Sequence, residues 1–449
     1  AGSAINSTDA NGTVAIGYSA LANLTSGQSN TAVGYDAGAS INTGAYNNLF
    51  GYQSGDAITT GNSNIAIGYQ SLSVTDDGDR NIAIGTSALN ANCADDNIAI
   101  GYGSLNASTS SDNIAIGTNT MIGHTTGAKN IAIGINAMDD TDAGSTSLDS
   151  DDNLFIGYDA GGGTWANVKS ENNIAIGNFT MDSALNGATD NTAIGWNALS
   201  AITEGDSNTV VGKYSGLVIT TGIRNTALGL NTLDAVTTGT RNIAVGAGAG
   251  SAIETTSYNI FIGNDAGALA TGTGAVGIGH DALKNYTGNY AVGIGYEAGV
   301  NLTSGANQVS IGYQAGKALT TTANSVFIGY QAGLTHTGGN NVAIGDRAFV
   351  NTDAGSNSLA STKNIAIGNF ALGGDLTDAQ VDGTVAIGYY ALGVATMGGI
   401  NYNIAIGMQS QQANAGGQNV AIGYATMKIA DGGETGNVAI GTSVMDVLN

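Results

Sequence analysis

The hydrophobic and polar residues of the chain follow one short pattern from end to end. Its clearest copy is Asn81-Ile82-Ala83-Ile84-Gly85, and 25 close copies occur, most of them 16 or 17 residues apart. With the glycine numbered 0, position −1 is aliphatic or Phe in every copy, position −2 is Ala in 17 copies, and position −4 is Asn in 19. A short period along a whole chain is typical of a solenoid, in which each repeat forms one coil.

Positions −3 to −1 of each repeat are expected to form a short β-strand. Alternation places the aliphatic positions −3 and −1 on one face and the small residues at −2 and 0 on the other. A face of small residues indicates close approach by another backbone, so we expect a second strand near positions +2 to +4, as in Gln70-Ser71-Leu72. Turns such as Thr59-Thr60-Gly61 would close the coil. The predicted fold is an all-β parallel β-solenoid of about 25 coils with 16–17 residues per coil.

Stacked coils bring the same position of successive repeats into columns. The Asn side chains at −4 are expected to form an amide column that bonds the coils above and below. The predicted structural ladder contains asparagines at −4 and isoleucines at −1, namely Asn64, Asn81, Asn97, Asn113, Asn130, Ile67, Ile84, Ile100, Ile116 and Ile133. Eleven repeats carry Tyr at +1. This tyrosine row is either a binding face or a set of half-buried rings with their hydroxyls in water.

The period lengthens at two places that resemble each other. The spacing is 23 and then 20 residues after Gly134 and again after Gly345. We therefore expect two tandem blocks: residues 1–228, with 12 coils and long loops near 139–152 and 161–172, and residues 229–449, with 13 coils and long loops near 350–363 and 373–383. The loops that break the period are candidate receptor contacts, through Thr141, Ser145, Ser147, Thr352, Ser356 and Ser358.

Composition narrows the classes of function. The net charge of −23, from 34 acidic and 11 basic residues, disfavours nucleic-acid binding, which needs clustered Lys and Arg. No apolar run is long enough to span a membrane. The single cysteine, Cys93, excludes an intramolecular disulfide and is expected to be a small filler in a turn. Because the chain starts at Ala1 without Met, we expect a processed or excised product.

Residue sets typical of enzymes are not found in the sequence, so no catalytic role is expected. The three histidines, His124, His280 and His336, lie in different repeats and are expected to be surface turn residues. Carboxylates cluster in some turns, and calcium takes several oxygen ligands. The candidate calcium ligands are Asp139, Asp140, Asp142, Asp149, Asp151 and Asp152, with solvated acidic loops as the alternative. No other cofactor is expected.

The Asn-Ile-Ala-Ile-Gly motif, followed by a small residue and Leu, resembles the head repeat of YadA-like trimeric autotransporter adhesins. Similar repeats occur in bacteriophage tail fibres and large bacterial surface proteins. The resemblance extends from about Gly12 to Val444. It implies a left-handed parallel β-roll, three chains around a common axis, and an extracellular location on a virion or a bacterial cell. The repeat here is longer than in the adhesin heads, so each coil should have a longer turn.

The aliphatic face at −3 and −1 also favours a homotrimer, because it needs a partner if the coil is too narrow to bury it. A wider coil would bury these residues internally and allow a monomer. The expected function is a structural fibre or stalk that displays or forms a receptor-binding surface. One alternative is a binding module in which the tyrosine row or the long loops contact a cell-surface receptor or glycan. Another is an extracellular filament whose subunits stack end to end through uncapped solenoid edges.

Overall fold

The computed structural model describes residues 11–141, 149–165, 168–351, 361–374, 380–393, 400–414, 416–430, 435–445 and 447–448. The chain divides into two compact units, Ala1–Asn225 and Thr226–Asn449. The predicted all-β parallel solenoid is confirmed in both units. Every regular element among the described residues is a β-strand, and these residues contain no helix.

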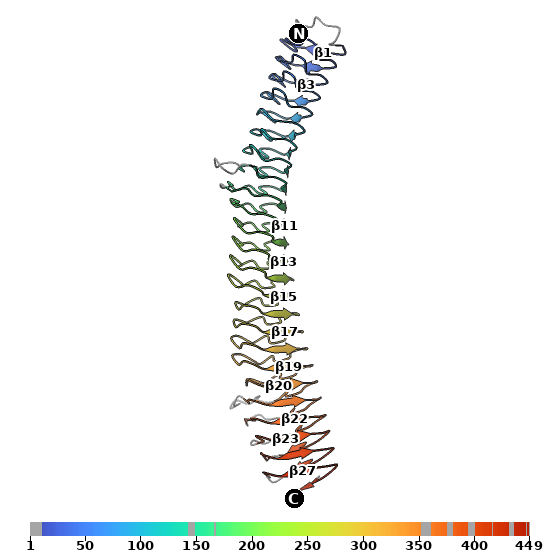
Figure 1. Ribbon diagram of the computed structural model, residues 1–449, viewed down its shortest axis with the longest axis vertical. Helices are drawn as coiled ribbons and strands as arrows, with labels where there is room; N and C mark the ends of the chain where they lie inside the picture. The colour runs from blue at the N-terminus through green and yellow to red at the C-terminus, as the bar shows by residue number, and fades with distance from the viewer. Residues whose placement is uncertain are drawn as a thin grey trace. The chain divides into compact units, whose positions relative to one another are not determined.

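Unit 1 is built from twelve three-residue strands, one in each copy of the motif (Figure 1). Consecutive strands pair in parallel with the same motif positions side by side, as in Ala83 opposite Ala99. The strands are β1 (Val14–Ile16), β2 (Thr31–Val33), β3 (Asn48–Phe50), β4 (Ile65–Ile67), β5 (Ile82–Ile84), β6 (Ile98–Ile100), β7 (Ile114–Ile116), β8 (Ile131–Ile133), β9 (Leu154–Ile156), β10 (Ile174–Ile176), β11 (Thr192–Ile194) and β12 (Thr209–Val211).

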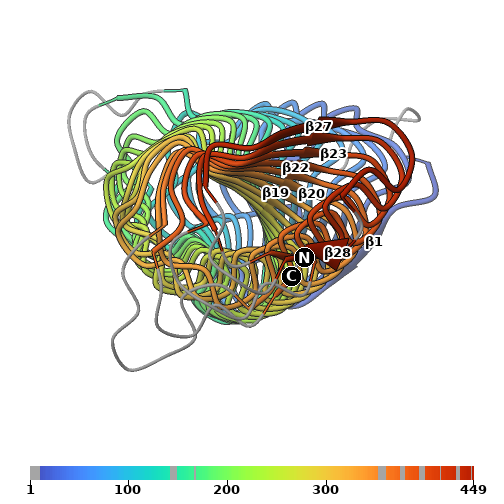
Figure 2. The same ribbon diagram turned by 90° about the horizontal axis from the view of Figure 1, so that it is seen from below.

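Unit 2 repeats this arrangement with thirteen such strands, which lie over one another on one side of the coil (Figure 2). They are β13 (Thr226–Leu228), β14 (Ile243–Val245), β15 (Ile260–Ile262), β16 (Val276–Ile278), β17 (Val292–Ile294), β18 (Val309–Ile311), β19 (Val326–Ile328), β20 (Val342–Ile344), β21 (Ile365–Ile367), β22 (Val385–Ile387), β23 (Ile404–Ile406), β25 (Val420–Ile422) and β27 (Val438–Ile440). Two-residue strands form a second parallel sheet, which the sequence did not suggest: β24 (Ala413–Asn414), β26 (Ile429–Ala430) and β28 (Val447–Leu448).

The expected second strand near Gln70-Ser71-Leu72 is wrong. This segment is a turn, in which Gln70 and Leu72 adopt φ values of 51° and 53°. A β-strand requires negative φ at every residue. Positive φ at Gln70 and Leu72, on either side of Ser71, therefore bends the chain and directs the Leu72 side chain into the interior. The backbone still bonds to neighbouring coils, because the Gln70 N–H donates to the Tyr52 carbonyl and the Leu72 N–H to the Ala88 carbonyl, at 2.9 and 3.0 Å.

Positions −2, +4 and +7 contribute side chains to the interior of the coils, and −2 and +4 of one coil are never both large. Where −2 is Ala, as at Ala83, position +4 is usually a large residue such as Leu89, and both are fully buried. Where −2 is Phe, position +4 in the same coil is Gly. A Cβ atom added to Gly267 would lie 2.4 Å from ring carbons of Phe261. Because interiors are close-packed, a Phe at −2 leaves no room for a side chain at +4 of the same coil.

Gln411 is the one polar residue at position +4 in the 25 copies. Its side chain is fully buried, and among the described residues neither its Oε1 nor its Nε2 has a hydrogen-bond partner. The same position is Met427 in the coil formed around β25. Leaving a buried polar group unsatisfied costs about 1–3 kcal/mol.

Gln411→Met is therefore expected to raise the free energy of unfolding by about 1–3 kcal/mol, since methionine fills the space without a polar atom. Urea denaturation of the full chain followed by circular dichroism measures the change. The control is Gln409→Met, at a partly exposed position of the same turn, which should change stability by less than about 0.5 kcal/mol. A Gln411→Met chain no more stable than the parent would contradict the prediction.

Candidate functional site

The side chains at −3, −1 and +1 of each coil point out of the solenoid, and we call them the outer strand face. The aliphatic residues at −1 stack in register, and in unit 1 this column includes Ile67, Ile84, Ile100, Ile116 and Ile133. Ile67 is 41% exposed and the other four are partly exposed. The alanines at −2 of the same strands are fully buried. An apolar column on the outside of a coil therefore extends along the described strands of each unit.

Tyrosine rings at +1 form two stacked columns beside the aliphatic residues. In unit 1 the ring centroids of Tyr18, Tyr35, Tyr52 and Tyr69 are 5.1, 5.1 and 5.3 Å apart in succession, with interplanar angles of 7–13°. In unit 2 the centroids of Tyr296, Tyr313 and Tyr330 are 5.3 and 5.2 Å apart. These rings remain 42–69% exposed. Their spacing is set by the backbone pairing of neighbouring coils.

The asparagines at −4, which directly precede each strand, form a buried ladder. The Asn64 Oδ1 accepts the backbone N–H of Asn81 at 2.8 Å, and the Asn64 Nδ2 donates to the Gly78 carbonyl at 2.8 Å. The same contacts recur at the other predicted ladder residues, Asn81, Asn97, Asn113 and Asn130. Each amide thus satisfies a backbone donor and a backbone acceptor that would otherwise be buried without partners.

A second polar column, at position −6, was missed by the sequence analysis. The Asn62 Oδ1 accepts the Ala45 N–H at 2.9 Å, the Asp79 Oδ1 accepts the Asn62 N–H at 2.6 Å, and the Asp95 Oδ1 accepts the Asp79 N–H at 2.9 Å. Unit 2 has the same contact between Asp382 and Thr362. The recurrence of Asp, Asn, Ser and Thr at −6 is the sequence signal from which this column could have been predicted. The aspartate carboxylates of this column therefore accept hydrogen bonds from backbone N–H groups of the turns.

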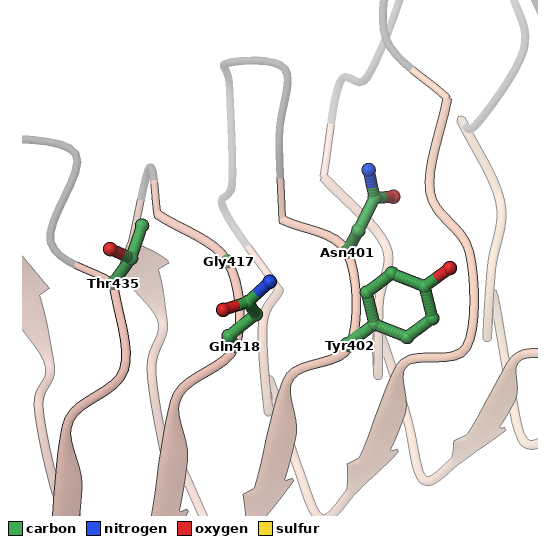
Figure 3. Close-up of a pocket in the computed structure, with 5 residues that line it drawn as sticks. All are labelled: Asn401, Tyr402, Gly417, Gln418 and Thr435. Atoms are coloured by element: carbon green, nitrogen blue, oxygen red, sulfur yellow. The ribbon is translucent and has the colours of Figure 1, made fainter.

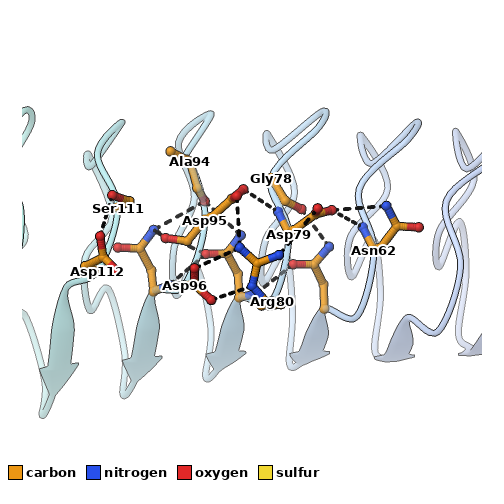
Figure 4. A network of polar contacts seen from close by, with 12 residues as sticks. Asn62, Gly78, Asp79, Arg80, Ala94, Asp95, Asp96, Ser111 and Asp112 are labelled. Atoms are coloured by element: carbon orange, nitrogen blue, oxygen red, sulfur yellow. Dashed lines mark hydrogen bonds and ion pairs between the residues drawn. The ribbon is translucent and has the colours of Figure 1, made fainter.

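In the acidic turns around Arg80, one guanidinium contacts three carboxylates (Figure 4). The guanidinium lies 2.6 Å from Asp96, 3.0 Å from Asp95 and 3.6 Å from Asp79. The hydrogen bond from Arg80 lowers the pKa of Asp96 and raises that of Arg80 itself. Because the Arg80 side chain is 51% exposed, water and salt screen the pairs, and they contribute little to stability.

Of the candidate calcium ligands, Asp142 lies outside the described residues and the other five are described. Asp151 accepts the Ala128 N–H at 2.7 Å and lies 3.3 Å from the Lys169 ammonium, and Asp140 accepts the Thr164 hydroxyl at 2.6 Å. Burial, with the Asp159 carboxylate adding to it, raises the pKa of Asp139 to about 6. In the described part of the chain, no three or more His, Cys, Asp or Glu side chains come together as a metal site.

The expectation that all three histidines are surface residues is wrong for two of them. His124 and His336 are fully buried, and both occupy position +7 of their coils. This position faces the interior, and in the two coils that precede the coil of His336 it is occupied by Leu302 and Leu319. The His336 ring stacks on Phe349 at 4.3 Å. His280 does lie at the surface, where its side chain is 47% exposed. The periodic position, rather than the polarity of histidine, decides where each ring lies.

Cys93 is buried, and its sulfur lies 3.0 Å from the Thr75 hydroxyl. Burial raises the pKa of its thiol to about 11, so the reactive thiolate is suppressed.

Among the candidate receptor contacts, the prediction for Thr141 is wrong, because its side chain is buried with its hydroxyl 2.8 Å from the His124 ring. The remaining candidates, Ser145, Ser147, Thr352, Ser356 and Ser358, lie outside the described residues.

A shallow surface depression lies along the turns of the last coils of unit 2 (Figure 3). Its lining residues come from positions −6 and −5 of three neighbouring coils: Asn401, Tyr402, Gly417, Gln418 and Thr435. The depression is open to solvent, and the exposed Tyr402 phenol is the one titratable group among its described lining residues. These described residues offer hydrogen-bonding groups and no acid–base pair.

No family model matches the chain, and no curated protein matches it either. Across the described residues, no helix is long and apolar enough to cross a bilayer. The outer strand face, with its aliphatic and tyrosine columns, is therefore the surface on which a functional proposal rests.

Proposed function

We propose that the chain is a non-enzymatic structural fibre or stalk of a viral tail fibre or a bacterial surface adhesin, which displays or forms a receptor-binding surface outside the cell. The observation that carries the proposal is the aliphatic column of the outer strand face. Ile67 is 41% exposed and Ile194 is 37% exposed, although both belong to strands whose opposite face is fully buried. Contiguous exposed apolar surface of this kind marks an interaction site.

The period of the column favours further copies of the same chain as the partner. Aliphatic residues recur once per coil, so only a surface with the same repeat can pack against many coils in succession. Three copies arranged around a common axis would bury the aliphatic columns, and closed symmetry would limit the assembly to a defined size. The motif's resemblance to the repeats of trimeric adhesin heads supports the same arrangement and a left-handed roll. We therefore propose a homotrimer.

The mass of the full chain in solution tests this proposal. Light scattering after size-exclusion chromatography should give three times the chain mass of 44.4 kDa. A double substitution, Ile100→Lys with Ile116→Lys, places two charges on the column and should shift the protein to a monomer with unchanged circular dichroism, because buried unpaired charges oppose association. The control, Thr109→Lys, lies on an exposed turn and should leave the trimer intact. A monomeric parent chain contradicts the trimer, and long polydisperse particles would favour the end-to-end filament.

A further inference from the structure

The tyrosine columns present open ring surface at regular steps. Two aromatic rings in face-to-face contact would have their planes about 3.5–4.0 Å apart. The near-parallel rings of Tyr35, Tyr52 and Tyr69 have centroids 5.1 and 5.3 Å apart, which is wider than that contact distance. The three tyrosines remain 45%, 42% and 50% exposed. The column is therefore a staircase with one partly open aromatic surface per coil.

A column of planar polar side chains runs beside each staircase at position +2. The Gln70 Nε2 donates to the Gln53 Oε1 at 3.0 Å in unit 1. In unit 2 the Gln331 Nε2 donates to Gln314 at 3.1 Å, and the Gln314 Nε2 donates to Glu297 at 2.9 Å. These contacts use one N–H of each amide, and an amide has two. Since the glutamines are only partly buried, the second donor can reach a ligand that lies on the rings.

The charges near the staircases exclude some classes of ligand. The net charge of the chain is −23, and Asp36 and Glu297 occupy the +2 position beside Tyr35 and Tyr296. A polyanion such as a nucleic acid or a sulfated polysaccharide would be repelled. Partly exposed aromatic rings next to amide donors and acceptors are suited to a ligand that has both C–H surface and uncharged hydroxyls. Neutral sugars combine these two properties in one ring.

We propose that the two staircases, Tyr35 to Tyr69 in unit 1 and Tyr296 to Tyr330 in unit 2, bind an uncharged, linear β-(1→4)-linked glycan, with one sugar on each coil. Such a glycan is extended, and its advance per sugar is close to the length of one pyranose ring, which is similar to the spacing of the tyrosines. An α-linked glucan curves and would lose register after a few coils. The inference goes beyond the proposed fibre role and requires that the tyrosine columns stay exposed in any assembly of the chain.

Calorimetric titration of the full chain with cello-oligosaccharides, from the disaccharide to the hexasaccharide, tests the proposal. Affinity should rise with each added sugar until the staircase is filled, while maltohexaose, the α-linked counterpart, should not bind. Tyr52→Ala, in the centre of the first staircase, should weaken binding of cellohexaose at that site by about 2- to 10-fold, the loss expected for one aromatic contact. The corresponding change in the second staircase is Tyr313→Ala.

The matched control is Tyr102→Ala. Tyr102 occupies the same motif position, but its neighbours in the column are Thr86 and Thr118, so it belongs to no staircase. This change should leave the affinity for cellohexaose unaltered, and circular dichroism should show that all variants retain the fold. Failure of cellohexaose to bind the parent chain would overturn the proposal. So would an equal loss in Tyr102→Ala, or a Tyr52→Ala variant that loses its oligomeric mass but retains binding.

Discussion

Gly267→Leu is expected to destabilise unit 2 by about 3 kcal/mol, and the same leucine is expected to be accommodated once Phe261 is alanine. The first added atom of a side chain at 267 would lie 2.4 Å from the Phe261 ring, which fills the interior of that coil. Overpacking of a well-packed core costs about 1–3 kcal/mol, and sometimes more. The backbone is not the obstacle, because Gly267 has φ 59° and Leu283, at the same position of the next coil, has φ 49°.

A double-mutant cycle on urea denaturation measures this coupling. Phe261→Ala alone should cost about 3–5 kcal/mol, because it leaves a cavity in the coil. The pair Phe261→Ala and Gly267→Leu restores the combination found in the coil of Ala83 and Leu89, so its cost should be smaller than that of either single change. The interaction energy should be at least about 2 kcal/mol. Additive single effects would show that the two positions do not share one space.

Asn64→Ala is expected to lower the stability of unit 1 by about 2–5 kcal/mol. The change removes the acceptor of the Asn81 N–H and the donor to the Gly78 carbonyl, both at 2.8 Å. Asn64 is fully buried, so water cannot replace these contacts without opening the coil. Each orphaned group costs about 1–3 kcal/mol. Hydrogen exchange should show the loss of protection concentrated in the coils of Asn64 and Asn81, because a solenoid is stabilised by contacts between neighbouring repeats.

Asn64→Asp separates the hydrogen bonds from the shape of the side chain. A carboxylate at this site still accepts the Asn81 N–H but faces the Gly78 carbonyl with a negative charge, so burial should raise its pKa above the unfolded value. The variant should then be least stable above the folded pKa and should regain stability as the pH falls toward the unfolded pKa. The control, Ser63→Ala, lies on the exposed side of the same turn and should change stability by less than about 0.5 kcal/mol. A pH-independent Asn64→Asp would contradict the ladder argument.

The strands and their two faces could be predicted from the sequence because alternation is a local property. Ile82, Ala83 and Ile84 show it directly: the two isoleucines are partly exposed and the alanine is buried. The amide column at −4 was also predictable, since in-register stacking follows from the period itself. The pairing of Phe261 at −2 with Gly267 at +4 can be read from the sequence. Its physical reason, that both positions face the interior of one coil, became clear only from the structure.

The turns could not be predicted in the same way. Leu72 and Gln70 have positive φ, a conformation that non-glycine residues rarely adopt and that no propensity indicates. It is maintained here by hydrogen bonds to the coils on either side. The positions of His124 and His336 were wrong for a related reason. Burial of a polar ring is decided by partners from other coils, such as Thr141 and Phe349, which lie 17 and 13 residues away in sequence.

For this protein, the amino-acid sequence by itself determined the period, the short strands and the residues that occupy each column, because all three depend on spacing along the chain. Tertiary structure alone decided the positive φ values of the turn residues, the carboxylates at −6 that accept backbone N–H groups, and the near-parallel stacking of Tyr35, Tyr52 and Tyr69. Each of these depends on atoms of two or three coils held at a fixed separation. A single repeat contains only one partner of every such contact.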